Sequence, residues 1–170
     1  MIKNGAVSGI VLLLLLIAVG HAAPFDDKSP AYFVDRYGPA KSSRVESKAG
    51  FTHTKYGSFG IKGPFSVREY RKDDLKVRAV FFYPSLRLAA VRLQFDHQWT
   101  REQIDAALAA YGGEWETIDR GPFSIRWQAP DGTEAISMLT WLDFQSKTVK
   151  DAVGKAAEEH EAKRKEVPKF

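Results

Sequence analysis

The chain of 170 residues contains no cysteine. This absence excludes a disulfide scaffold, a thiolate metal site, a cysteine nucleophile and an acylated cysteine as lipid anchor. The chain also has no large excess of positive or negative charge: it contains 25 Lys and Arg and 21 Asp and Glu, which gives a formal net charge of +4. Apolar residue types make up 44% of the chain, which is too many for a disordered protein. We therefore expect a folded protein whose stability comes from an apolar core.

Long apolar runs are also missing. The longest uncharged, mostly apolar stretch runs from Ala6 to Val19, which is 14 residues (19 − 6 + 1), whereas a membrane-spanning helix needs about 20. Lys3 precedes this stretch, and the small residues Gly20 and Ala22 follow it. A basic start, a short apolar run and small residues are typical of a secretory signal peptide. We expect residues 1–22 to be cleaved after Ala22 and the protein to be periplasmic or secreted, without an integral membrane span. An uncleaved anchor is the alternative.

Two segments carry signals for the start and end of a helix. Ser29 and Pro30 suit the cap and first position of the first helix, which Gly38 ends. In the second helix, Thr100 and Gln103 have the spacing of a capping box. An apolar stripe at helical spacing follows, and Gly112 ends the segment; the stripe consists of Ile104, Ala107, Leu108 and Tyr111.

Apolar residues alternate with polar ones in three other segments, which predicts half-buried strands. These segments are Val77 to Tyr83, Val91 to Phe95, and Ile125 to Trp127. Pro130, Asp131 and Gly132 predict a hairpin turn, because glycine accepts the positive φ that closes it.

From about Ser146 onward the sequence predicts a charged, solvated helix. The alternative is that the narrow apolar stripe of this helix docks onto a partner.

The chain also matches itself at an offset of 58. Gly63-Pro64-Phe65-Ser66-Val67-Arg68 recurs as Gly121-Pro122-Phe123-Ser124-Ile125-Arg126. Carried forward without a gap, the offset places Asp73-Asp74 on the predicted turn and the strand from Val77 to Tyr83 on Ala135 to Trp141. Helices ending at Tyr37-Gly38 and Tyr111-Gly112 precede the two copies. Self-similarity at a fixed offset indicates repeated architecture, although coincidence among common strand-entry residues is the alternative.

This match predicts an α+β fold of two tandem units, each a helix followed by an antiparallel β-meander. We place the units at residues 23–97 and 98–145, the second one shorter, and the charged helical tail at residues 146–170. The first unit would carry about 16 extra residues, between Lys41 and Gly57, and a third strand from about Leu86 to Phe95. In the second unit the tail would take the place of that third strand.

A helix ending in Gly-Pro, followed by a strand, a turn and aromatic-rich strands, resembles known exported modules. The pattern lies in Tyr37-Gly38-Pro39, in Tyr70 with Val77 to Phe81, and again in Tyr111-Gly112 with Trp127. Over most of residues 29–142 it is similar to small outer-membrane-assembly lipoproteins and to tandem β-lactamase-inhibitor-protein-like units. The resemblance implies a non-enzymatic, protein-binding module of the cell envelope. The chain departs from both groups because it has no lipobox cysteine and no cysteine pair.

Local motifs for catalysis or cofactor binding are missing. The sequence contains no His-Glu-x-x-His, no Gly-x-Ser-x-Gly, no Gly-x-Gly-x-x-Gly and no phosphate-binding Gly-Lys-Ser/Thr. We expect no catalytic residue, no metal and no cofactor, and we place His97 in a loop ahead of the Thr100 cap. The alternative is a small envelope hydrolase whose site is assembled across the fold, with His53 or His97 in a cleft.

Basic residues interleaved with aromatics cluster between Arg68 and Arg92. Such a surface favours an acidic protein or polymer as partner, and export argues against nucleic acid. A solvated outer sheet face is the alternative. We assign the four tryptophans to core and staple positions: Trp99, Trp115, Trp127 and Trp141. The partner-binding candidates are Arg68, Tyr70, Lys72, Arg78, Arg92 and, from the second copy of the motif, Arg126.

Overall fold

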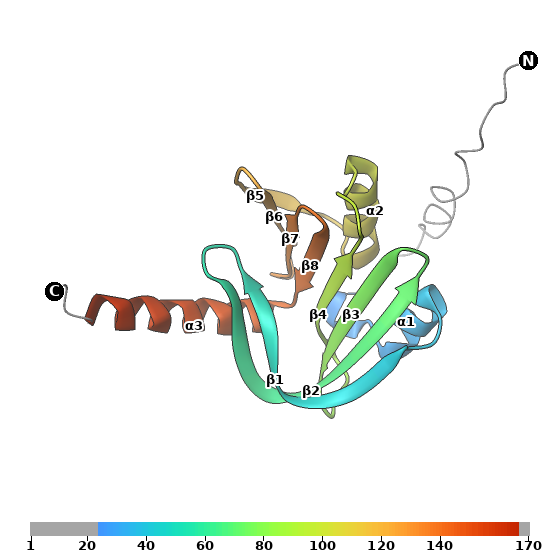
Figure 1. Ribbon diagram of the computed structural model, residues 1–170, viewed down its shortest axis with the longest axis horizontal. Helices are drawn as coiled ribbons and strands as arrows, with labels where there is room; N and C mark the ends of the chain where they lie inside the picture. The colour runs from blue at the N-terminus through green and yellow to red at the C-terminus, as the bar shows by residue number, and fades with distance from the viewer. Residues whose placement is uncertain (1–23, 167–170) are drawn as a thin grey trace, which may run out of the picture.

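The computed structural model describes residues 24–166, so the predicted signal peptide lies outside the described residues. Within them three α-helices and eight antiparallel strands form an α+β fold (Figure 1), which confirms the expected class. The helices are α1 (Pro30–Tyr37), α2 (Arg101–Tyr111) and α3 (Lys147–Glu166), and a 3-10 turn, η1 (Phe25–Asp27), precedes them. None of these helices has the length and hydropathy that a membrane crossing requires.

All eight strands belong to one sheet with the order β1-β2-β3-β4-β8-β7-β6-β5. Neighbouring strands along the chain pair as hairpins within each half, and β4 pairs antiparallel with β8 where the halves meet. The strands are β1 (Ser42–His53), β2 (Gly57–Lys72), β3 (Leu75–Phe82), β4 (Leu88–Gln94), β5 (Glu116–Arg120), β6 (Ser124–Gln128), β7 (Glu134–Met138) and β8 (Trp141–Gln145).

The helix boundaries follow the signals in the sequence. In α2 the Thr100 hydroxyl accepts from the Gln103 N–H, and the Gln103 side chain accepts from the Thr100 N–H, so the capping box is confirmed. In α1 Pro30 occupies the first turn and Gly38 ends the helix with a φ of 81°, a value that favours glycine. Ser29 stands at the N-cap position, but its side chain makes no capping hydrogen bond.

The two faces of the sheet bury separate apolar clusters. Helices α1 and α2 cover the first face, where Phe33, Tyr70, Phe81, Tyr111 and Phe144 pack with other large side chains. The hydroxyls of Tyr37 and Tyr111 lie 2.9 Å apart in this cluster and satisfy each other where water does not reach. We call this side the helical face.

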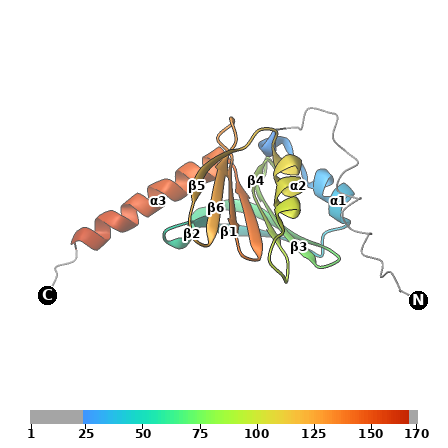
Figure 2. The ribbon, with the colours of Figure 1, turned by 90° about the horizontal axis from the view of Figure 1, so that it is seen from above.

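The opposite face meets α3 instead. Val149 and Val153 of α3 pack against Phe51, Phe65 and Val80 from the first three strands. The long β1–β2 hairpin bends around toward α3, as Figure 2 shows from above, and α3 contacts β1, β2 and β4. We call this side of the sheet the arginine face, for the side chains described below.

Two expectations about the strands were wrong, and one strand was not predicted. Strand β1 lies in the segment between Lys41 and Gly57, for which we predicted no strand. Tyr83 lies beyond the end of β3 and is exposed. Trp141 begins β8 rather than ending the preceding strand, because Leu139 and Thr140 form a turn after Met138. Strand β8 therefore lies directly before α3, where we expected the charged tail to follow the second unit without a further strand.

The sequence match between residues 63–68 and residues 121–126 also does not correspond to equivalent positions in the sheet. Two residues connect β2 to β3 between Lys72 and Leu75, whereas five connect β6 to β7 between Gln128 and Glu134. Because side chains alternate along a strand, this odd difference of three reverses the faces of β6 relative to β2. Arg68 consequently lies on the helical face, with its guanidinium over the Phe81 ring, while Arg126 lies on the arginine face beside Glu134.

The aromatic cluster on the helical face gives the first prediction. Phe33 is fully buried and contacts five other rings, so Phe33→Ala should lower the free energy of unfolding by about 3–5 kcal/mol. Phe123→Ala makes the same chemical change at a ring that is 71% exposed and should cost less than about 0.5 kcal/mol. Equilibrium denaturation in urea measures both values, and equal losses would contradict the proposed core.

Candidate recognition face

One line of paired residues crosses all eight strands on the arginine face. Each member lies directly opposite the next in the strand register, and we call this line the charged row. From β1 to β5 it consists of Ser42, Glu69, Arg78, Arg92, Asp143, Ile136, Arg126 and Asp119. Three arginines and three carboxylates make the row formally neutral, so opposite charges are matched within the face itself.

Arg92 and Asp143 occupy the middle of the row, at the β4–β8 junction. The Arg92 Nε donates to one carboxylate oxygen of Asp143 and its Nη2 to the other, both at 2.7 Å. Thr52 donates its hydroxyl to the same carboxylate at 2.5 Å and accepts from Arg92 Nη2 at 3.0 Å. The Asp143 side chain is only 7% exposed and that of Arg92 is 40% exposed. A buried carboxylate thus fixes a guanidinium whose outer edge faces solvent.

Trp141 completes this central group. The guanidinium carbon of Arg92 lies 4.6 Å from the Trp141 ring centroid, within the range of a cation–π interaction. Trp141 therefore stacks beneath an arginine on the arginine face, which corrects its assignment to the core. The other three tryptophans pack into or against the helical-face cluster: Trp99, Trp115 and Trp127.

A second ion pair repeats the same design in β6 and β7. Arg126 donates through Nε and Nη2 to one oxygen of Glu134, with 3.0 Å between Nε and that oxygen. Glu134 is buried while Arg126 retains partial exposure. Arg126 thus places two N–H donors on one oxygen of the buried carboxylate, and this charge-assisted contact compensates part of the hydration that Glu134 loses on burial.

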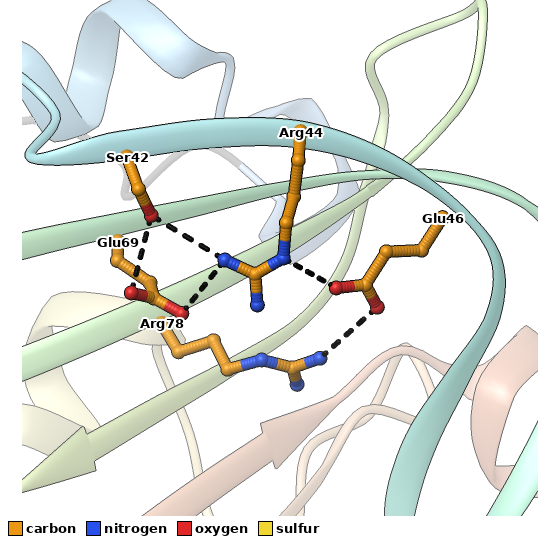
Figure 3. Close-up of polar contacts among 5 residues, drawn as sticks. All are labelled: Ser42, Arg44, Glu46, Glu69 and Arg78. Atoms are coloured by element: carbon orange, nitrogen blue, oxygen red, sulfur yellow. Dashed lines mark hydrogen bonds and ion pairs between the residues drawn. The ribbon is translucent and has the colours of Figure 1, made fainter.

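The third group lies at the β1 end of the row (Figure 3). Arg44 donates to Glu46 at 2.6 Å and to Glu69 at 3.1 Å, and Arg78 approaches Glu46 at 3.9 Å. The hydrogen bond from Arg44 lowers the pKa of Glu69, although partial burial opposes the shift. Burial lowers the pKa of Arg78, which the charge of Glu46 partly offsets. These side chains are more exposed than the two buried carboxylates.

The structure divides the six candidate residues between the two faces. Arg78, Arg92 and Arg126 lie on the arginine face, each near a carboxylate that sequence spacing did not reveal. Tyr70 is buried in the helical-face cluster, stacked on Phe33, and burial raises the pKa of its phenol. Arg68 shares that face, and Lys72 donates to the Arg36 carbonyl near the end of α1. The six therefore do not form a single surface.

A small cavity lies at the side of the arginine face, between the β1–β2 hairpin, the sheet and α3. Its volume is about 120 Å³, and its polar lining includes Thr52, His53, Arg126, Glu134, Gln145 and Lys150. At the tip of the hairpin His53 stacks on Tyr56, and Tyr56 contacts His160 of α3. Lys55 forms an ion pair with Glu161 at 3.4 Å and joins the same two elements.

The two histidines named as candidates, His53 and His97, lie in different parts of the fold. His97 lies in the loop before Thr100, as expected, with Nε2 3.2 Å from Asp74 and its ring stacked on Phe95. His53 lines the cavity near Glu134, but the Thr52 hydroxyl beside it is donated to Asp143. Within residues 24–166 no three His, Asp or Glu side chains are grouped to hold a metal ion.

Comparison of the chain with protein-family models, with curated proteins and with solved structures gave no match. What the arginine face does must therefore be argued from its own geometry.

His53 gives a prediction about pH. Partial burial and the nearby Arg126 charge lower its pKa in the folded state. The unfolded chain then binds more protons at mildly acid pH, so the contribution of His53 to stability is complete above about pH 6.5 and declines as the pH falls through the lowered pKa. Because the ring is largely solvated, we expect a loss below about 1 kcal/mol.

Urea denaturation at pH 7.5 and pH 5 (roughly one unit or more on either side of the ordinary histidine pKa) measures this decline. His53→Gln should be less sensitive to the change of pH than the wild-type protein. His97→Gln, at a histidine outside the cavity, is the matched control because it leaves His53 and its surroundings in place. If the His53 variant loses as much stability as the wild type, this assignment is wrong.

Proposed function

We propose that the protein is an exported, non-enzymatic binding module of the cell envelope whose arginine face binds an acidic protein or polymer. Export rests on the signal-peptide pattern in residues 1–22. Binding rests on one observation above all: buried Asp143 holds Arg92 in place over Trp141, with part of the guanidinium still exposed. Arginine and tryptophan are the residue types most enriched among binding hot spots.

The orientation of Arg92 favours recognition over a purely structural role. A guanidinium carries five N–H donors, and the contacts to Asp143 and Thr52 involve only its Nε and Nη2 nitrogens. The donors on Nη1 stay available to a carboxylate on a partner. Because the side chain is already ordered, binding costs little further conformational entropy.

The neutrality of the charged row limits the kind of partner. A surface whose arginines are matched by carboxylates has no strong attraction for every polyanion, and like charges placed opposite each other are costly. The partner we propose therefore carries carboxylates spaced to meet Arg44, Arg78 and Arg92, with gaps opposite Glu46 and Glu69.

We further propose that the sheet consists of two tandem units. Each half has a helix followed by four antiparallel strands, and the strand order reads identically from both edges toward the β4–β8 junction. In the first half Tyr70 lies opposite Val77, and in the second half Trp127 lies opposite Ala135. Both pairs belong to the helical-face cluster, so they occupy equivalent places in the two halves. The resemblance to tandem exported inhibitor modules remains a prediction beside this one.

Salt-dependent retention on immobilised poly-glutamate tests the binding proposal. Arg44→Gln/Arg78→Gln removes two partly exposed cations whose carboxylate partners are not deeply buried, so the fold should survive. We expect this variant to bind roughly 3- to 10-fold more weakly at low salt. The matched control, Arg101→Gln/Lys155→Gln, removes two exposed cations from α2 and α3 and should bind like the wild type.

Equal weakening in both variants would mean that only net charge matters and would refute a specific face. No retention of the wild type at low salt would contradict the proposed contact between side-chain carboxylates and the arginine face.

A further inference from the structure

The cavity beside the arginine face has a chemical character of its own. Its walls come from four parts of the chain: the β1 end of the hairpin, strands β6 and β7, the end of β8, and the first half of α3. A volume of about 120 Å³ holds several water molecules. It is therefore large enough for a molecule of five or six heavy atoms.

The lining includes one positive group, the Lys150 ammonium, that forms no ion pair with another wall residue. Arg126 and Glu134 bind each other, so their charges cancel at the wall. Lys150, from α3, donates to the Gln128 side chain at 2.8 Å, which involves only one of its three N–H donors. An ammonium group with donors to spare, in a partly enclosed site, favours a carboxylate on the ligand.

The lining also includes a buried polar group that lacks a partner. Gln145 is 1% exposed, and its Nε2 donates to the Thr52 carbonyl at 2.9 Å. Its Oε1 has no hydrogen-bond partner within residues 24–166. A buried acceptor without a donor is costly, and one N–H from a ligand would remove that cost. Glu134 lies on the same wall, and its Oε2 accepts neither of the two hydrogen bonds from Arg126.

From these two features we infer that the cavity is a binding site for a small zwitterion of the α-amino-acid type. The ligand carboxylate would meet Lys150, and the ligand ammonium would lie toward Gln145 and Glu134. The volume admits glycine or alanine and excludes amino acids with large side chains. This site is independent of the acidic partner proposed for the arginine face, because it needs no charge in the exposed part of the charged row.

Titration of the full-length protein with glycine, followed by amide NMR shifts, tests the inference. We expect binding in the millimolar range, as suits so small a ligand, with shifts confined to the residues around the cavity: Thr52–Thr54, Glu134, Gln145 and Lys150–Gly154. Acetate and methylammonium each carry half of the glycine charges and should bind at least about tenfold more weakly. Leucine should not bind.

Lys150→Gln should weaken glycine binding about tenfold, because it removes the charge that faces the carboxylate while keeping a polar side chain. The matched control, Lys155→Gln, removes an exposed lysine of the same helix that does not line the cavity.

The inference is overturned if glycine causes no localised shifts, if acetate alone binds as tightly as glycine, or if both lysine variants behave alike. The comparison of ligands on the wild-type protein decides the matter even if a variant does not fold. Retention on poly-glutamate is a separate readout, so failure here leaves the arginine-face proposal standing.

Discussion

The ion pair between Arg92 and Asp143 is the interaction on which the rest of the structure depends. It lies where β4 and β8 join the two halves of the sheet, and the Asp143 carboxylate is almost fully buried there. A buried carboxylate is tolerated only when charge and hydrogen bonds compensate its lost hydration. Arg92 supplies the charge, and Thr52 supplies a further donor from the β1–β2 hairpin. One carboxylate thereby fixes the sheet junction, the bent hairpin and the exposed guanidinium together.

The same constraint explains why the two faces of the sheet differ. The helical face is filled with rings under α1 and α2, and the Arg68 guanidinium lies over the Phe81 ring there. On the arginine face α3 covers only part of the sheet, and the uncovered middle must carry polar groups. Carboxylates among those groups pair with arginines across strands, which leaves a rigid pattern of charge at the surface, with Arg78 directly opposite Arg92. A rigid pattern of this kind can distinguish partners by the spacing of their charges.

The sequence permitted accurate prediction where the cause is local. The Thr100 capping box, the Gly38 helix end and the alternation in β3 and β4 depend on neighbours within a few residues. Strand β1 was missed because most of its first seven residues are exposed and show no regular alternation of apolar side chains. The gapless repeat failed because the lengths of two turns, which sequence identity across the motif does not reveal, decide the face of every side chain in β6.

The site was predictable only in part for a different reason. Arg78, Arg92 and Arg126 were identified by their charge, but their partners come from other strands. Asp143 is 51 residues from Arg92, and Thr52 is 40 residues from it on the other side. No local pattern reports such a pairing. The cavity was missed likewise, since its lining is assembled from the hairpin, the sheet and α3.

A double-mutant cycle on Arg92 and Asp143 tests the central claim most directly. Unfolding free energies of Arg92→Met, Asp143→Leu and the double variant, measured in urea, give the coupling between the two side chains. Arg92→Met leaves the buried Asp143 charge without its partner and should cost about 3–5 kcal/mol, whereas Asp143→Leu leaves a guanidinium that solvent reaches and should cost less; the double variant should cost far less than the sum. Additive losses would show that the two side chains do not depend on each other and would contradict the account.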